Sequence, residues 1–130
     1  MGRGKIPTKS NKIIPLVAMV PGLLGKFIFD AVTGITKSDN LDKLIWGIDP
    51  GATYNFDTAL EAIVPCDQNI FYDNSLGAIG KTKYVEFKLR LKNGNHTLEK
   101  YHILGDVDDY ELTTEPTKIL GTSELLKTAN

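Results

Sequence analysis

Residues 83–94, KYVEFKLRLKNG, decide the fold class. Apolar and charged side chains alternate strictly along this stretch, which predicts a β-strand with one buried face and one solvated face. The Asn93-Gly94 pair that follows is the strongest short-range signal for a hairpin turn. We therefore predict an antiparallel hairpin over residues 83–104. The buried face of its first strand is expected to consist of Val85, Phe87, Leu89 and Leu91.

The return strand, expected over residues 97–104, has mixed faces. A two-residue turn would place Leu98 opposite Leu89 but Lys100 opposite Phe87. A bulge or a longer loop through Asn95 and His96 would shift this register. The sequence leaves both registers open.

Residues 13–25, IIPLVAMVPGLLG, form the most apolar run of the chain. The run imitates a signal peptide but lacks a clear small-x-small cleavage site. It is shorter than the roughly 20 apolar residues that span a bilayer, so we expect no transmembrane segment. We predict a strand over 13–20 and a helix over 21–35, because apolar residues recur at helical spacing after Pro21. We favour packing of this helix on a sheet over a position at a membrane surface.

Further short strands are expected over residues 44–48, 54–64, 70–72 and 110–114. For 54–64 a short helix is the alternative, since Thr58 and Glu61 have the spacing of a capping box. Residues 122–126 suggest one or two helical turns. Trp46 and Phe56 are expected to join the core with the buried face of the hairpin.

These elements predict a mainly β fold, a small antiparallel β-sandwich or jelly-roll-like barrel with one short helix near the N-terminus. The length of 130 residues fits one domain. We divide the chain into a basic extended arm at 1–12, a single β-rich domain at 13–116 and a C-terminal tail at 117–130.

Charge is distributed unevenly although the net charge is only −1. Residues 1–12 contain basic side chains and no acid, whereas residues 106–115 contain acids and no base. A short basic arm can bind nucleic acid or anionic lipid, and a solvated tail is the alternative. The candidate contacts to such a partner are Arg3, Lys5, Lys9 and Lys12.

No pattern of reactive residues predicts catalysis or a metal site. Cys66 is the only cysteine, and we expect it to be a buried structural side chain. His96 and His102 lack a chelating helical spacing. The acidic run that begins at Asp106 lacks the glycine and the final glutamate of a calcium loop. We therefore predict no enzyme activity, no metal and no cofactor.

The basic arm on a small β domain suggests a structural subunit of a large assembly, namely a viral capsid or other virion protein. Its partners would be copies of itself or other subunits, and its location would be the virion or otherwise the cytoplasm. The alternative is a monomeric binding module with a ligand site in the loops at 73–82 or 105–116.

Overall fold

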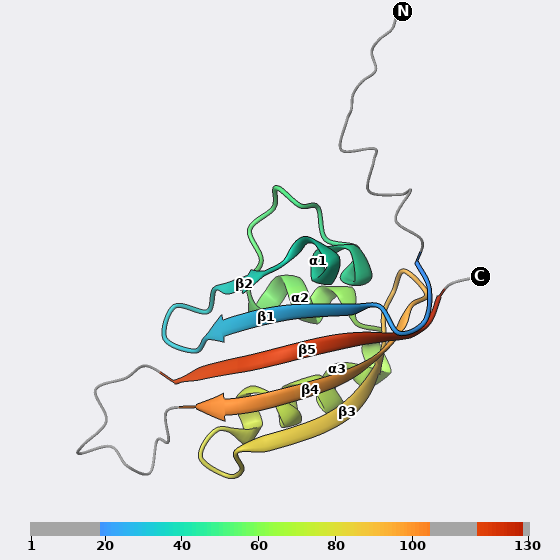
Figure 1. The fold of residues 1–130 in the computed structure, drawn as a ribbon. Coiled ribbons are helices and arrows are strands. Elements are labelled where there is room, and N and C mark those ends of the chain that lie inside the picture. Colours follow the sequence, from blue (N-terminus) through green and yellow to red (C-terminus); the bar gives the residue numbers. More distant parts are fainter. Residues whose placement is uncertain (1–18, 105–116, 129–130) are drawn as a thin grey trace, which may run out of the picture.

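A five-stranded antiparallel sheet with the strand order β2-β1-β5-β4-β3 forms the base of the fold (Figure 1). The computed structural model describes residues 19–104 and 117–128. The C-terminal strand lies in the middle of the sheet, between β1 and β4. The strands are β1 (Leu24–Asp30), β2 (Thr36–Ser38), β3 (Tyr84–Arg90), β4 (His96–Leu104) and β5 (Lys118–Lys127).

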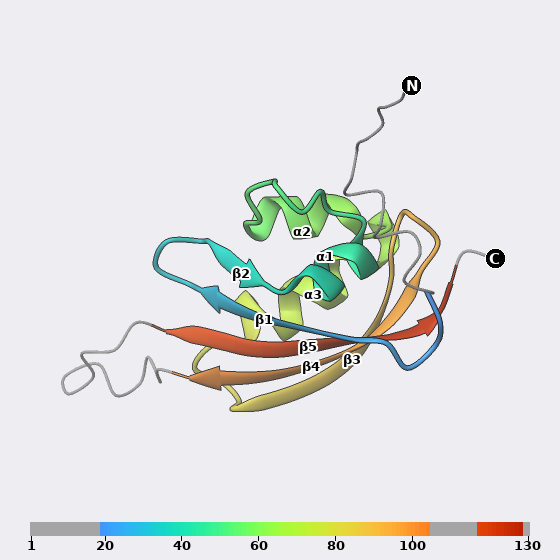
Figure 2. The same cartoon turned by 45° about the horizontal axis from the view of Figure 1, so that its top comes forward.

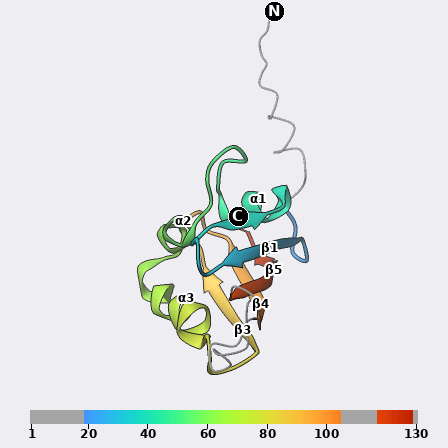
Figure 3. The same ribbon diagram turned by 90° about the vertical axis from the view of Figure 1, so that its left-hand side faces the viewer.

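The helices follow one another between β2 and β3 and cover one face of the sheet (Figures 2 and 3). Within the described residues no second sheet packs on this one, so the prediction of a β-sandwich or jelly-roll-like barrel is wrong. The fold is an open sheet with a helical layer. The helices are α1 (Asn40–Trp46), α2 (Phe56–Ala62) and α3 (Gln68–Asn74), with short 3₁₀ turns η2 (Pro65–Asp67) and η3 (Leu76–Ala78).

The predicted hairpin is confirmed, because β3 pairs antiparallel with β4. Its turn is longer than two residues: the backbone N–H of Leu91 donates to the carbonyl of Asn95 at 2.8 Å, and Gly94 has a φ of 96°. This turn shifts the register by one residue. The inward-facing pairs are Val85–Tyr101, Phe87–Glu99 and Leu89–Thr97.

The predicted helix at 21–35 is wrong, since this segment contains β1 and the turn that leads to β2. Its apolar residues fit a helical spacing, but Gly25, Phe27 and Phe29 also alternate with outward-facing neighbours. Hydrogen bonding along both edges of β1 outweighs the helical pattern. The helical turns expected at 122–126 are wrong for the same reason, because these residues belong to the central strand β5.

The strands predicted at 44–48 and 70–72 are wrong, and the helical alternative at 54–64 is correct. In α1, Asp39 accepts a hydrogen bond from the Asp42 backbone at 2.8 Å, and Gly47 ends the helix with a φ of 74°. In α2 the cap is Asn55, which accepts from the Thr58 backbone at 2.8 Å. Helices of seven residues make only two turns, too few for the period to be recognised.

The core lies between the inner face of the sheet and the helices. Phe87, Leu89, Leu91 and Trp46 are buried as predicted, whereas Val85 and Phe56 are half-buried and pack against the core.

Two glycines allow close packing on this inner face. A Cβ atom on Gly25 would overlap the backbone of Asp42, so α1 can approach β1 only because Gly25 lacks a side chain. A Cβ atom on Gly121 would overlap the ring of Phe27. The two contacts fix the positions of α1 and of the Phe27 ring relative to the sheet.

Several sequence expectations fall outside the described residues. They are the strands at 13–20 and 110–114, the acidic run at 106–115 and the arm with Arg3, Lys5, Lys9 and Lys12. No helix within residues 19–104 and 117–128 is long and apolar enough to cross a membrane.

Replacement of Phe87 tests the position of the core. Phe87 is 8% exposed, and its ring meets that of Tyr101 edge-on at 4.9 Å. We expect Phe87→Ala to lower the free energy of unfolding by about 3–5 kcal/mol, measured by urea denaturation. Lys88→Ala, at an exposed position of the same strand, should change it by less than about 0.5 kcal/mol. A loss below about 1 kcal/mol for Phe87→Ala would contradict this assignment.

Candidate functional site

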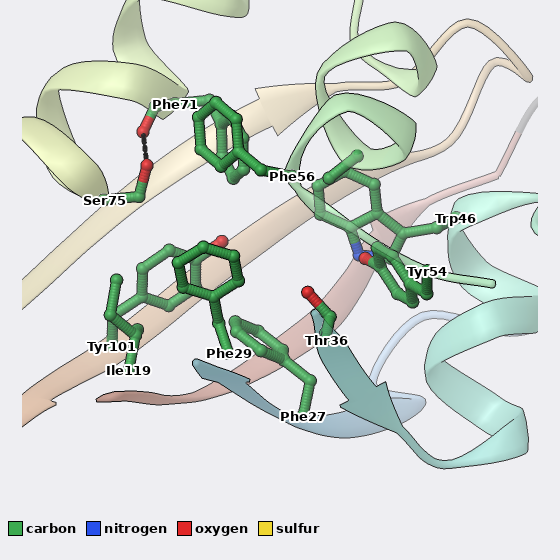
Figure 4. A pocket seen from close by; sticks show the side chains of 11 residues that line it. Phe27, Phe29, Thr36, Trp46, Tyr54, Phe56, Phe71, Ser75, Tyr101 and Ile119 are labelled. Carbon is green, nitrogen blue, oxygen red and sulfur yellow. Dashed lines mark hydrogen bonds between the residues drawn. The ribbon is translucent and has the colours of Figure 1, made fainter. Parts of the chain in front are cut away.

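A small cavity lies between the sheet and the helical layer (Figure 4). Its volume is about 20 Å³, which is space for about one water molecule. Most of its wall is aromatic. The lining residues are Phe27, Phe29, Thr36, Trp46, Tyr54, Phe56, Ala59, Phe71, Ser75, Tyr101 and Ile119.

The aromatic rings are held in place by contacts with one another. Phe56 of α2 stacks on Phe71 of α3 with ring centroids 5.0 Å apart. On the sheet side, Phe27 meets Tyr101 edge-on at 5.1 Å. The helices thus form one side of the cavity and the sheet forms the other.

The cavity wall offers few polar groups. Ser75 is buried, and its hydroxyl donates to the backbone carbonyl of Phe71 at 2.6 Å (Figure 4). Thr36 of β2 supplies a second hydroxyl to the wall. Such a wall suits a ligand that is bound mainly by contact with aromatic faces.

Two carboxyl groups, Asp42 and Glu99, lie completely buried in the same core. Asp42 belongs to the first turn of α1 and Glu99 to the inner face of β4. Ser123 of β5 donates to Glu99 Oε1 at 2.8 Å, and the Tyr101 hydroxyl donates to the same oxygen at 2.9 Å. The indole N–H of Trp46 donates to Ser123 Oγ at 2.9 Å. A chain of hydrogen bonds therefore connects α1 with β5 and β4.

The remaining carboxyl oxygens lack donors. Both side-chain oxygens of Asp42, and Oε2 of Glu99, have no hydrogen-bond partner within the described part of the chain. No basic side chain of these residues forms an ion pair with either acid. An ionised carboxylate without a partner is very costly in a protein interior, so burial favours the protonated forms.

Burial accordingly raises both pKa values into the neutral range. It raises the pKa of Asp42 to about 7, with a further contribution from the charge of Asp39. It raises the pKa of Glu99 to about 8, and the charge of Asp42 adds to this shift. Burial also raises the pKa of the Tyr54 and Tyr101 hydroxyls. The acid pair, by which we mean Asp42 and Glu99, is thus partly protonated at neutral pH.

Cys66 is exposed, so the prediction that it is buried is wrong. It lies on η2, and its sulfur accepts a hydrogen bond from the Arg90 guanidinium at 3.0 Å. The same guanidinium binds both carboxylate oxygens of Asp67, with distances of 3.0 and 2.7 Å. This pairing lowers the pKa of Asp67. Cys66 does not line the aromatic cavity.

The two histidines do not combine into a site. His102 is exposed on β4, where its ring lies 4.7 Å from that of Tyr84, and His96 is at the other end of the strand. Within residues 19–104 and 117–128, no group of three or more histidine, cysteine or acidic side chains could hold a metal ion.

Comparison with known proteins identifies the fold through structure alone. No family model matches the sequence, and no curated protein matches it. The domain of a putative light and redox sensing histidine kinase from Haloarcula marismortui superposes with a TM-score of 0.66 at 13% identity, covering 91% of this chain and 100% of that one. An RNA-binding Light-Oxygen-Voltage receptor gives 0.62 at 15% identity, covering 79% of this chain and 28% of that one. The chain has the PAS fold.

The PAS fold overturns the prediction of a structural virion or capsid subunit. That prediction rested on a basic arm attached to a small β-sandwich or jelly-roll-like barrel, and the open sheet with its helical layer is a different architecture. The alternative prediction of a binding module agrees better with these similarities. Its loop sites are not where the cavity lies: Ser75 is the one residue of 73–82 in the cavity wall, and 105–116 lies outside the described residues.

Sequence reasoning missed the acid pair. Asp42 is the third residue of α1, a helix that the sequence analysis does not predict. Glu99 gave a signal, because it shares its face of the return strand with Tyr101 and Ile103. A charged residue in phase with two large apolar residues indicates either a wrong register or a buried acid.

The acid pair predicts that stability depends on pH. Both acids have pKa values raised above those of the unfolded chain, so the folded state binds their protons more tightly. The contribution of these two groups to the free energy of unfolding should therefore be largest below about pH 4. It should fall by on the order of a few kcal/mol as the pH rises through about 8. Urea denaturation between pH 5 and pH 9 measures this slope.

Glu99→Gln should flatten the dependence, because an amide keeps the acceptor oxygen and cannot ionise. Glu86→Gln, at an exposed position of β3, is the matched control and should keep the wild-type slope. Equal slopes for wild type and Glu99→Gln would show that Glu99 does not titrate in this range.

Proposed function

We propose that this chain is a sensory binding module that takes a small ligand into its aromatic cavity. The observation that carries the proposal is the enclosure of the cavity between sheet and helices by seven aromatic side chains. Aromatic faces supply large contact areas with little loss of conformational freedom. A largely apolar pocket with a few polar groups is the usual form of a small-molecule site.

The structural similarities support a sensory role. One similar domain comes from a putative light and redox sensing histidine kinase, and the other belongs to a Light-Oxygen-Voltage receptor. The present chain spans 28% of the latter, so the RNA binding in that receptor's description is not carried over. What the similarities support for this chain is a sensor that responds to a bound molecule.

A ligand larger than water enters only if the helical layer shifts. Helix α2 is the element best suited to move, because its one buried residue is the small Ala59, whereas α3 buries the ring of Phe71 and α1 buries three residues. Phe56, at the start of α2, is half-buried and closes the cavity against Phe71. Displacement of the Phe56 ring would join the cavity to the surface.

A cofactor with three fused rings, such as a flavin, would need a much larger displacement of the helical layer than a compact ligand does. Sites for cofactors of that size have volumes of roughly 300–1,000 Å³, whereas this cavity measures about 20 Å³. The single thiol also lies outside it, at Cys66 on the exposed η2 turn. A compact ligand therefore agrees better with the residues present.

We also propose that the chain binds without catalysing a reaction. The buried hydroxyl in the wall, Ser75, is engaged with a backbone carbonyl. The Cys66 thiol contacts Arg90, which cannot act as a general base. Neither nucleophile is thus activated by a neighbouring base.

Ligand binding can be followed through Trp46, the only tryptophan of the chain and part of the cavity wall. We expect saturable changes in its fluorescence with at least one of phenol, 3,3-dimethylbutan-1-ol and choline. Phe56→Ala should strengthen that binding about tenfold or more. In the wild type only molecules whose Phe56 ring has moved aside can bind, so the apparent affinity is lowered in proportion to that open fraction.

Ile70→Ala is the matched control, because Ile70 is exposed on the neighbouring helix α3. It should leave the affinity unchanged. The proposal is wrong if none of the three probes gives a saturable change in either wild type or Phe56→Ala, both confirmed as folded by circular dichroism.

A further inference from the structure

The core beside the aromatic cavity contains buried carboxyl oxygens without a hydrogen-bond partner among the described residues. Asp42 and Glu99 are fully buried and together leave three carboxyl oxygens without a partner among the described residues. The Thr97 hydroxyl is also fully buried and lies beside Glu99, whose pKa it lowers as a hydrogen-bonding neighbour. Buried polar groups are normally satisfied, and carboxyl oxygens without a donor are stabilised instead by a positive charge nearby.

Three aromatic residues connect this acid pair with the cavity. Trp46, Tyr54 and Tyr101 all line the cavity (Figure 4). At their polar ends, Trp46 donates to Ser123 and Tyr101 donates to Glu99. The charges of Asp42 and Glu99 both act on the Tyr54 hydroxyl. The rings therefore separate a cavity on one side from buried acids on the other.

Both sides of this wall favour a positive charge in the cavity. The faces of tryptophan and tyrosine rings attract cations through their negative quadrupole, most strongly where water is excluded. An ionised carboxylate behind the wall adds attraction that the interior screens weakly. Since the cavity wall has few hydrogen-bonding groups, an alkylated ammonium suits it better than a strongly hydrated metal ion.

We propose that the cavity selects a small organic cation whose charge is an alkylated ammonium group, with the acid pair supplying the counter-charge. This proposal rests on the proposed function, because it names the class of ligand for the same cavity. The ligand itself needs no hydrogen-bond donor. Its positive charge stabilises the ionised forms of Asp42 and Glu99, which lose their protons when the ligand binds.

Binding of the cation is therefore coupled to proton release. The titratable groups that face the pair are Asp39 next to α1, Tyr54 in the following loop and Tyr101 on β4. On the packed strands β1 and β5, Gly25 and Ser123 contribute no titratable side chain. Since the carboxyl pKa values lie at about 7 and about 8, cation binding near neutral pH should expel a proton into the solvent.

The test compares choline with 3,3-dimethylbutan-1-ol, its neutral isostere in which carbon replaces nitrogen. Both are titrated into the full chain at pH 8 with Trp46 fluorescence as the signal. Choline should bind about tenfold tighter or more, because cation–π attraction alone is worth roughly thirtyfold at a desolvated site. Between pH 8 and pH 6 the affinity for choline should fall, while that for the isostere stays constant.

Variants assign the selectivity to the acid pair. Glu99→Gln and, as a second replacement of similar shape, Asp42→Asn should each reduce the preference for choline. The exposed Glu86→Gln is the matched control and should keep it. Calorimetry of choline binding in two buffers with different ionisation enthalpies should show the released proton as a difference in heat.

The possible failures are distinguishable. Equal binding of choline and its isostere to wild type would overturn the choice of ligand class and leave the cavity as a binding site. Undiminished preference for choline in both Glu99→Gln and Asp42→Asn would overturn the role of the acid pair. Binding of neither compound, nor of phenol, to wild type or Phe56→Ala would refute the proposed function itself.

Discussion

The hydrogen bond from the Trp46 indole to Ser123 joins the helical layer to the middle of the sheet. Ser123 lies on β5, the central strand, and its hydroxyl donates a hydrogen bond to Glu99 on β4. Trp46 in turn packs against the rings of Tyr54 and Phe71, from the loop before α2 and from α3. The position of the helices over the sheet, and with it the shape of the cavity, thus depends on one buried indole N–H and the polar chain that accepts it.

Such a polar chain is an expensive way to hold a core together. A buried carboxyl costs free energy that an apolar side chain of similar volume would not, and the missing donors around Asp42 increase that cost. Protein sites that accept local instability are commonly those with a function. The acid pair lies beside an aromatic cavity rather than at a random point of the core, which is why we assign both features to one site.

The sequence predicts the β3–β4 hairpin well, because seven alternating residues and an Asn-Gly turn agree with each other. It predicts the layer above the sheet poorly. Each helix there is seven residues long, and caps such as Asp39 and Asn55 are also common in loops. The site was harder still, because its defining residues come from separate parts of the chain. Glu99 becomes meaningful only when the one-residue shift at Gly94 places it opposite Phe87.

The glycines that admit Asp42 and Phe27 limit how far this sequence can diverge. A side chain at Gly25 would collide with the backbone of Asp42 and one at Gly121 with the ring of Phe27, whereas the outward-facing positions of β3 accept many polar residues. Similarity to other PAS folds at 13–15% identity therefore resides in the path of the backbone. Distant relatives of this chain should therefore share a few residues at fixed places rather than an overall similarity. These residues are two glycines and a buried aspartate, glutamate and tryptophan. A sequence search for that signature would detect homologues that alignment over the whole chain does not detect.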